Sequence, residues 1–242
     1  MDFRKISNIS VDCVVLGFDN VNINILLSKR LLHMYDDKYP VVDDWILTGN
    51  HVYRSERLDE SALRIFKELT GLENVYMKQF RTFGNPERIK NDRDLLWVKS
   101  RDTDPRTMSV AYYFLLPSSQ VVLRDKDTQW FPIKSLPQLG FDHKEIITRA
   151  YTDLKEKVMS EPVIFEFLDD KFTLNDLQLA YESILDIEID NRNFRKKTIS
   201  KTYIVPLNEK RVGASKKPSK LFMFSRDIYN KTSDKHNVIN LF

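Results

Sequence analysis

The order of apolar and polar residues over the first 160 positions predicts strands interrupted by two helices. Runs of branched and aromatic residues, which favour strands, occupy residues 11–18, 23–30, 45–47, 75–83, 108–116 and 129–133. Helical spacing of apolar residues marks residues 60–69 and 145–158, and Gly71 stands where the first helix would want a left-handed cap. This mixed order predicts an α+β sandwich of sheet and helices.

Two stretches interrupt this pattern. Residues 84–106 are polar and charged, so they predict a long loop of the kind that often carries function, with Trp97 folding back onto the domain. Ser160-Glu161-Pro162 predicts a domain boundary. We therefore divide the chain into residues 1–160 and 161–242. The total of 242 residues is enough for two domains.

The second domain carries the pattern of two capped helices joined by a short turn. Thr173 and Asp176 form a capping box, and apolar residues from Leu174 to Leu185 then share one face. Asp190 can cap the next helix, 191–201, in which Phe194 points inward and the basic residues outward. Strands at 202–205 and 221–224 flank a basic loop, which predicts a winged helix-turn-helix.

Charge is distributed unevenly between these parts. Residues 191–242 hold 13 Lys and Arg against 3 Asp and Glu, although the net charge of the whole chain is only +3. A basic segment attached to an acidic body is the footprint of a polyanion-binding domain. Two alternatives remain: a solvated basic face that aids solubility, and helices that dock a protein.

Double-stranded operator DNA is the partner that the basic helix and loop predict. Arg192 and Asn193 lie at the start of the helix, where they can reach base edges, and the loop cations can meet phosphates. The candidate DNA-binding residues are Arg192, Asn193, Arg195, Lys196, Lys197, Lys201, Lys210, Arg211, Lys216, Lys217 and Lys220.

Residues 50–72 resemble the Nudix hydrolase box, G-x5-E-x7-R-E-U-x-E-E-x-G-U, where U is apolar. Asn50 stands at the first glycine, and Glu56, Arg64, Glu68 and Gly71 match their positions without a gap. In a Nudix enzyme, carboxylates at i, i+3 and i+4 of the helix hold Mg²⁺ or Mn²⁺ and assist the attack of water on a diphosphate.

Two of those three carboxylate positions are occupied by Ile65 and Leu69, which offer no lone pair. We therefore expect no catalytic residue, no metal and no cofactor: the fold remains and hydrolysis is lost. Arg64 and Glu56 are expected to brace the loop and helix. The competing hypothesis is an active hydrolase of ADP-ribose or a sugar nucleotide that borrows metal ligands elsewhere and carries a nucleic-acid-binding appendage.

Further segments resemble the NrtR family of Nudix-related transcriptional regulators. They are Phe80–Arg88, Ser109–Tyr113, Trp130–Pro132, Leu136–His143 and, like that family's recognition-helix signature, Asn191–Lys197. The resemblance implies a Nudix-fold α/β/α sandwich followed by a winged helix-turn-helix domain. The sequence looks closest to the branch that represses arabinose-utilisation genes, which implies a small sugar effector, L-arabinose.

A sugar needs neutral polar and carboxylate partners and often an aromatic wall, whereas a diphosphate needs several cations. The candidate effector-binding residues are Asp43, Asp44, Trp45, His51, Tyr53, Arg81, Asn85 and Arg88. Each has a structural alternative, as a core side chain for Trp45 or as a solvated charge for the Asp and Arg residues.

The remaining expectations concern assembly and location. Helix-turn-helix regulators commonly bind pseudo-palindromic sites as dimers, so we expect a homodimer whose operator affinity falls when the effector binds. The chain has a single cysteine and no apolar run long enough to cross a bilayer. We therefore expect no membrane partner and a cytoplasmic location.

Overall fold

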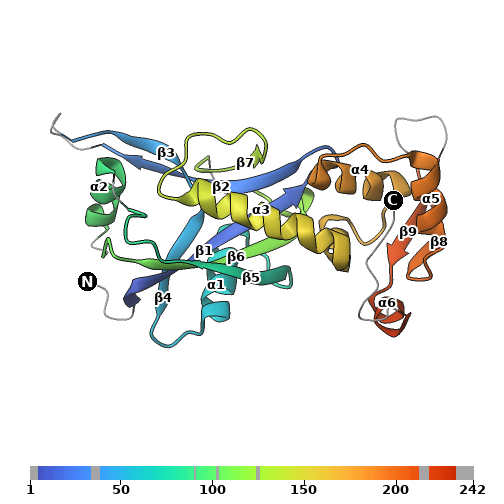
Figure 1. Ribbon diagram of the computed structural model, residues 1–242, viewed down its shortest axis with the longest axis horizontal. Coiled ribbons are helices and arrows are strands. Elements are labelled where there is room, and N and C mark those ends of the chain that lie inside the picture. Colours follow the sequence, from blue (N-terminus) through green and yellow to red (C-terminus); the bar gives the residue numbers. More distant parts are fainter. Residues whose placement is uncertain are drawn as a thin grey trace. The chain divides into compact units, whose positions relative to one another are not determined.

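The computed structural model describes residues 5–33, 39–89, 91–101, 104–123, 126–212 and 218–232. The chain folds into two compact units, whose elements are labelled in Figure 1. The first comprises residues 1–17, 24–115 and 119–151, and the second comprises residues 18–23, 116–118 and 152–242. The predicted domain boundary after residue 160 stays a prediction.

A seven-stranded sheet forms the core of the first unit. Its strands are β1 (Lys5–Phe18), β2 (Ile23–Leu32), β3 (Val42–Ile46), β4 (Thr48–Tyr53), β5 (Tyr76–Phe83), β6 (Met108–Pro117) and β7 (Thr128–Pro132). The order is β3-β2-β1-β6-β5, with β4 paired to β1 and β7 paired to β2. Residues 11–18 of β1 and 109–117 of β6 are buried without alternation, because both faces of these central strands are covered.

Helix α1 (Leu58–Thr70) packs on this sheet through the apolar stripe that the sequence predicts. Phe66 stacks on Phe114 of β6 with ring centroids 4.3 Å apart. The buried Cys13 of β1 donates its thiol to the carbonyl of Ala62 at 3.7 Å. Gly71 ends the helix with φ 76°, and its N–H donates to the Lys67 carbonyl at 2.8 Å, so the predicted cap is confirmed.

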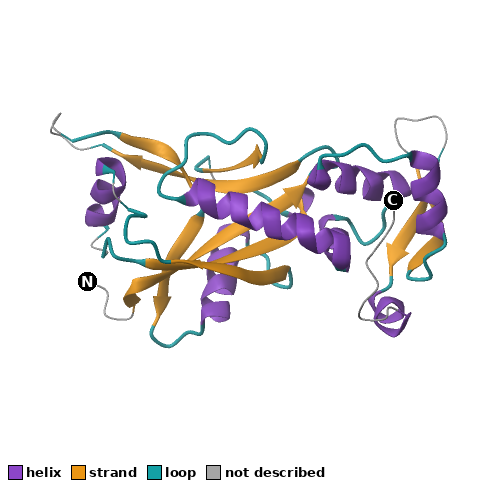
Figure 2. Cartoon of the chain, viewed as in Figure 1, coloured by secondary structure: helices purple, strands orange, loops and turns teal. Residues whose placement is uncertain are grey.

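Two segments differ from the predicted pattern. Residues 48–53, for which the apolar pattern predicts no strand, form β4. The predicted long loop contains helix α2 (Asp92–Ser100), seen among the helices in Figure 2. Asn91 caps α2 by accepting the N–H of Asp94, and the helix buries Asp94 and Val98. A polar stretch therefore forms a helix here with a side-chain cap at Asn91 and with Asp94 and Val98 buried.

The second unit is a winged helix. Its elements are the later part of α3 (His143–Ser160), η2 (Pro162–Phe167), α4 (Leu174–Leu185), α5 (Asn191–Ile199), β8 (Ile204–Arg211), β9 (Ser219–Phe224) and α6 (Arg226–Thr232). The Thr173–Asp176 capping box and the Asp190 cap form as predicted, and Phe194 is fully buried. Strands β8 and β9 are antiparallel. The predicted fold class is thus confirmed.

In the described part of the chain, no helix combines the length and the apolar character that crossing a bilayer requires.

Candidate ligand pocket and nucleic-acid interface

The surviving residues of the Nudix-like motif form a brace. Arg64 of α1 donates from Nε and Nη2 to both oxygens of Glu56, at 2.6 and 3.0 Å, and its guanidinium lies 4.2 Å from the centre of the Tyr53 ring. Glu56 also accepts the N–H of Tyr53 at 3.2 Å. Hydrogen bonding from Arg64 lowers the pKa of the Glu56 carboxyl. The expected bracing by Arg64 and Glu56 is therefore present.

The donor set of this motif does not fit a divalent cation. Ile65 is 2% exposed and lies in the core, and Leu69 offers only methyl groups. Glu56 is already bound to Arg64, and the Glu68 side chain is 58% exposed. Across the described residues, no group of three or more His, Cys, Asp and Glu side chains could hold a metal ion.

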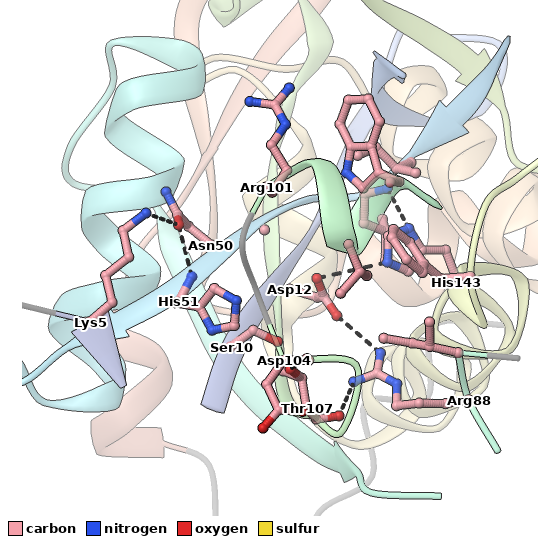
Figure 3. Close-up of a pocket in the computed structure, with 17 residues that line it drawn as sticks. Lys5, Ser10, Asp12, Asn50, His51, Arg88, Arg101, Asp104, Thr107 and His143 are labelled. Atoms are coloured by element: carbon pink, nitrogen blue, oxygen red, sulfur yellow. Dashed lines mark hydrogen bonds and ion pairs between the residues drawn. The ribbon is translucent and has the colours of Figure 1, made fainter. Parts of the chain in front are cut away.

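A pocket of about 540 Å³ opens beside β1 and β4, on residues outside the motif helix (Figure 3). Such a volume falls within the range of small-molecule sites. Charged, polar, aromatic and aliphatic residues all contribute to its lining: Lys5, Ser10, Asp12, Ile46, Leu47, Gly49, Asn50, His51, Arg88, Ile89, Trp97, Val98, Arg101, Asp104, Thr107, Phe141 and His143.

A buried network around Asp12 forms one side of this pocket, and Figure 3 shows that carboxylate between Arg88 and His143. Asp12 lies 3.5 Å from Arg88 Nη2 and 3.8 Å from His143 Nε2, and it accepts the Ser109 hydroxyl. Arg88 also makes two hydrogen bonds to Asp142, at 2.7 and 3.0 Å. The cation of Arg88 is thus balanced by two carboxylates.

His143 is held as a neutral imidazole. Its Nδ1 accepts the N–H of Leu47 at 2.9 Å, so the ring hydrogen belongs on Nε2, which faces Asp12. Burial lowers the pKa of His143. An Asp12 oxygen and an imidazole N–H beside the same cavity can together contact a hydroxyl group, which both donates and accepts.

The opposite side carries Lys5, Asn50 and His51. Lys5 Nζ donates to Asn50 Oδ1 at 3.2 Å, and the His51 N–H donates to the same oxygen at 2.8 Å (Figure 3). The His51 ring nitrogen Nδ1 lies 3.2 Å from the carbonyls of Ile6 and Ile9. Burial lowers the pKa of His51.

Of the eight predicted effector-binding residues, His51 and Arg88 line this pocket. Asp44 is buried against Arg30 and Arg93 and borders a second hollow. The other five are elsewhere in the unit: Asp43 beside Lys29, Trp45 against Phe131, Tyr53 under Arg64, Arg81 exposed on β5, and Asn85 accepting the N–H of Glu87.

The pocket also contains residues that the sequence reasoning did not select. Asp12 sits inside a run that signals only a buried strand. Trp97 and the Leu136–His143 segment, which supplies Phe141 and His143, do carry signals: an isolated tryptophan in a polar stretch and a run of family-like residues. These two signals could have identified Trp97, Phe141 and His143 as candidate pocket residues.

Helix α5 presents the predicted basic side chains to solvent. Arg192, Asn193, Arg195, Lys196 and Lys197 are all exposed, whereas Phe194 and Thr198 are buried. Hydrogen bonds fix the turn before the helix: Gln178 of α4 donates to the Ile189 carbonyl at 3.1 Å and accepts from Asn191 at 3.1 Å. Asn191 in turn accepts Arg195 Nε at 2.7 Å, so this guanidinium is oriented on the exposed face.

The wing shows a mixed outcome for the other predicted residues. Lys210 and Lys220 are exposed and Lys201 is partly buried. Arg211 is bound to Asp176 at 2.8 Å and to the Lys171 carbonyl at 2.9 Å. Lys216 and Lys217 lie outside the described residues. The whole DNA-binding set stays a prediction, supported at α5 by the exposure of its cations.

Comparison with known proteins finds a family model for the winged helix and relatives that align with longer stretches of the chain. Residues 164–224 match the family model described as the NrtR DNA-binding winged helix domain. The chain is 26% identical over 230 residues to the ADPR responsive transcriptional repressor NtrR of Acinetobacter baylyi, covering 91% of this chain and 83% of that protein. An ADP-ribose pyrophosphatase of Methanocaldococcus jannaschii is 30% identical over 128 residues, covering 51% of this chain and 63% of that protein.

Among solved structures, Shewanella oneidensis NrtR complexed with a 27mer DNA aligns with a TM-score of 0.73 and 24% identity, covering 92% of this chain and 95% of that chain. A MutT/nudix family protein of Enterococcus faecalis aligns with a TM-score of 0.65 and 22% identity, covering 91% and 89%. These likenesses show a shared fold, with a Nudix-type unit joined to a winged helix.

Proposed function

We propose that this chain, as a member of the NrtR family of Nudix-related transcriptional regulators, is a repressor controlled by a small molecule. It binds double-stranded operator DNA through α5 and the wing, and the pocket beside Asp12 takes the effector. The observation that carries this proposal is the exposed basic face of α5 in an NrtR-type winged helix. Cations at this position meet phosphates and base edges when a recognition helix enters the major groove.

The chemistry of the pocket favours a neutral polyhydroxylated effector. The Arg88 cation is already paired with carboxylates, and Lys5 is held by Asn50. Asp12 and His143 offer an acceptor and a donor, and Trp97 and Phe141 supply aromatic walls. We therefore propose a free pentose, with L-arabinose as the first probe, and repression of sugar-utilisation genes, following the family branch that the sequence resembles.

A second candidate effector is ADP-ribose. Its support is the name of the Acinetobacter relative, an ADPR responsive repressor, together with the cation of Arg101, which stacks on Trp97 at 4.6 Å in the pocket wall. A diphosphate would require this arginine, Lys5 and Arg88 to act together as cationic partners.

The decisive experiment measures operator binding by gel shift, with and without L-arabinose, other pentoses and ADP-ribose. Allosteric coupling is typically about 1–3 kcal/mol, so the effector should weaken operator affinity about 5- to 150-fold. Release by L-arabinose alone supports the pentose, and release by ADP-ribose alone supports the second candidate. Operator affinity that no ligand changes would contradict the effector hypothesis, and failure to bind duplex DNA at low salt would contradict the repressor.

We also propose that the first unit has no diphosphate hydrolase activity. Ile65 and Leu69 replace two oxygen ligands, and Glu56 is committed to Arg64. The test is release of phosphate or monophosphate from ADP-ribose with Mg²⁺ or Mn²⁺. Turnover at an ordinary rate that is abolished in Glu68→Gln would overturn this proposal and favour the enzyme.

The repressor is proposed to act as a homodimer, because two winged helices related by a two-fold axis match a pseudo-palindromic operator. Light scattering of the purified protein, alone and with a duplex operator, tests this directly. A monomer in both states would contradict the proposal.

A further inference from the structure

A cluster of buried ions lies behind the aromatic wall of the pocket. Arg30 of β2 donates to both oxygens of Asp44 in β3, at 2.7 and 2.8 Å, and its Nη2 also lies 2.7 Å from Asp94 of α2. The Arg30, Asp44 and Asp94 side chains are each 1–2% exposed. Arg93 of α2 completes the cluster, with Nη2 2.6 Å from Asp44.

This cluster fixes the first turn of α2 to the sheet. Asp94 is bonded to Arg30 and to the Asn91 side chain, and its two oxygens also accept the N–H of Phe141 at 3.1 and 3.2 Å. One carboxylate therefore joins three parts of the unit: strand β2, the start of α2 and the segment at Phe141.

The same guanidinium contacts the wall of the pocket. It lies 4.6 Å from the centre of the Phe141 ring and 5.7 Å from the centre of the Trp97 ring, and both residues line the cavity. Close packing extends to Gly140, where a Cβ would lie 2.4 Å from Arg30 Nη2. The wall is thus built directly on Arg30.

Stability alone does not account for such a cluster. Buried ion pairs contribute little over apolar packing, because desolvating two charges offsets their attraction, although breaking one is costly. The planar fork of arginine does offer a geometric restraint, since it can bind two carboxylates at once, which a lysine ammonium cannot reproduce. Binding sites in turn depend on a supporting layer that holds the contacting groups in place.

We infer that Arg30 is a positioning residue of the effector pocket, which sets the placement of α2 and of the Phe141 segment and so shapes the Trp97–Phe141 wall. This inference rests on the proposed function for the identity of the ligand. It does not rest on that function for the placement of α2, which is measurable without any ligand.

The first test compares Arg30→Lys with the wild-type full-length protein by hydrogen–deuterium exchange without ligand. Amides of residues 92–100 should exchange faster in the variant, while those of α1 keep their protection. Arg57→Lys is the matched control, because Arg57 makes ion pairs with Asp59 and Glu60 while 76% exposed. Unchanged protection of α2 in Arg30→Lys would overturn the inference whether or not any sugar binds.

The second test measures binding of L-arabinose and of ADP-ribose by calorimetry. Residues that act without touching a ligand change coupling by about 0.5–2 kcal/mol, which is about 2- to 30-fold in affinity. Arg30→Lys should weaken binding within that range and leave operator affinity without ligand within about twofold. Wild-type affinity in Arg30→Lys would overturn the positioning role.

If neither ligand binds the wild-type protein, the effector identities fail, and the exchange experiment alone decides the role of Arg30. If Arg30→Lys does not fold, Asp94→Asn serves instead. It retains one oxygen acceptor for the Phe141 N–H but removes the charge that binds Arg30, so the same loss of α2 protection is expected, and normal protection would overturn the inference.

Discussion

In the pocket-bearing unit, Arg30 and Arg88 are buried against carboxylates, whereas the arginines and lysines of α5 stand exposed to solvent. Arg192, Arg195 and Lys196 lie on the exposed side of α5, whereas Phe194 and Thr198 are its buried residues. The paired charges act at short range and fix the positions of their neighbours. The exposed charges leave their field available to an approaching polyanion. Arginines therefore hold neighbouring residues in place in the first unit, whereas the basic side chains of α5 in the second unit are available to attract a polyanion.

The largest expected effect comes from breaking a buried pair. Arg88→Met leaves Asp142 and Asp12 without their cation, so the free energy of unfolding should fall by about 3–5 kcal/mol. Urea denaturation followed by tryptophan fluorescence measures this change, because Trp45, Trp97 and Trp130 all belong to this unit. The double variant Arg88→Met/Asp142→Asn should recover part of the loss. A single-variant loss below about 1 kcal/mol would contradict the view that these charges hold the unit together.

The next effect concerns the exposed set. Arg195→Ala should reduce operator affinity about tenfold to a hundredfold, because a hydrogen bond that involves a charged group is worth about 1.5–3 kcal/mol. Its unfolding free energy should change by less than about 0.5 kcal/mol, as for other surface substitutions. Gel shifts and urea denaturation measure the two quantities, with Arg57→Ala as the control for operator affinity. Lost stability together with unchanged affinity would reverse the comparison.

A smaller effect should follow from removing the support of that arginine. Asn191→Ala loses the 2.7 Å bond to Arg195, and one hydrogen bond is worth about 0.5–1.5 kcal/mol, so operator affinity should fall about two- to tenfold. In an Arg195→Ala background the same change should have a smaller effect, because the contribution that acts through Arg195 is already lost and only the Asn191–Gln178 bond remains to be broken. Additive losses in this double-mutant cycle would show that Asn191 acts independently.

The smallest expected effect is a pH dependence of stability. Burial lowers the pKa of His143 and His51, so the folded protein keeps both neutral while unfolded histidines take up protons near pH 6.5 (about the ordinary value). Stability is therefore present above about pH 6.5 and is lost as the pH falls, by less than about 1.4 kcal/mol per pH unit for each histidine. His143→Gln, whose amide oxygen can still accept the Leu47 N–H, should flatten this profile in urea denaturation. An unchanged slope would contradict the assignment.

Sequence patterns predicted the elements whose apolar spacing is strong. The sequence predicted the central strands, α1 with its Gly71 cap, and the capped helices α4 and α5. In these elements the apolar positions are the buried ones, and the cap residues stand at the observed ends. Helix α2 could not be predicted from the sequence, because it is held by an ion pair between Asp94 and Arg30 of β2, two residues 64 positions apart. Tertiary contacts of this kind override a polar local pattern.

The candidate site was predicted less completely than the fold. The loss of the motif carboxylates was visible in the sequence, and His51 and Arg88 were found because they lie near the motif or in family-like segments. Asp12 was hidden, because its neighbours Val11 and Cys13 signal only a buried strand. His143 begins helix α3, far along the chain from Asp12, and its hydrogen bond to the Leu47 N–H holds it beside that carboxylate. No local spacing in the sequence shows this contact.

The single cysteine of this chain is sealed between β1 and α1. Burial raises the pKa of the Cys13 thiol, so both access and thiolate formation are suppressed in the folded state. An alkylating reagent can therefore modify the protein only when this strand and helix separate. The rate at which Cys13 is alkylated, followed by mass spectrometry, therefore reports the opening of the first unit. Ligands that bind and stabilise that unit should lower this rate.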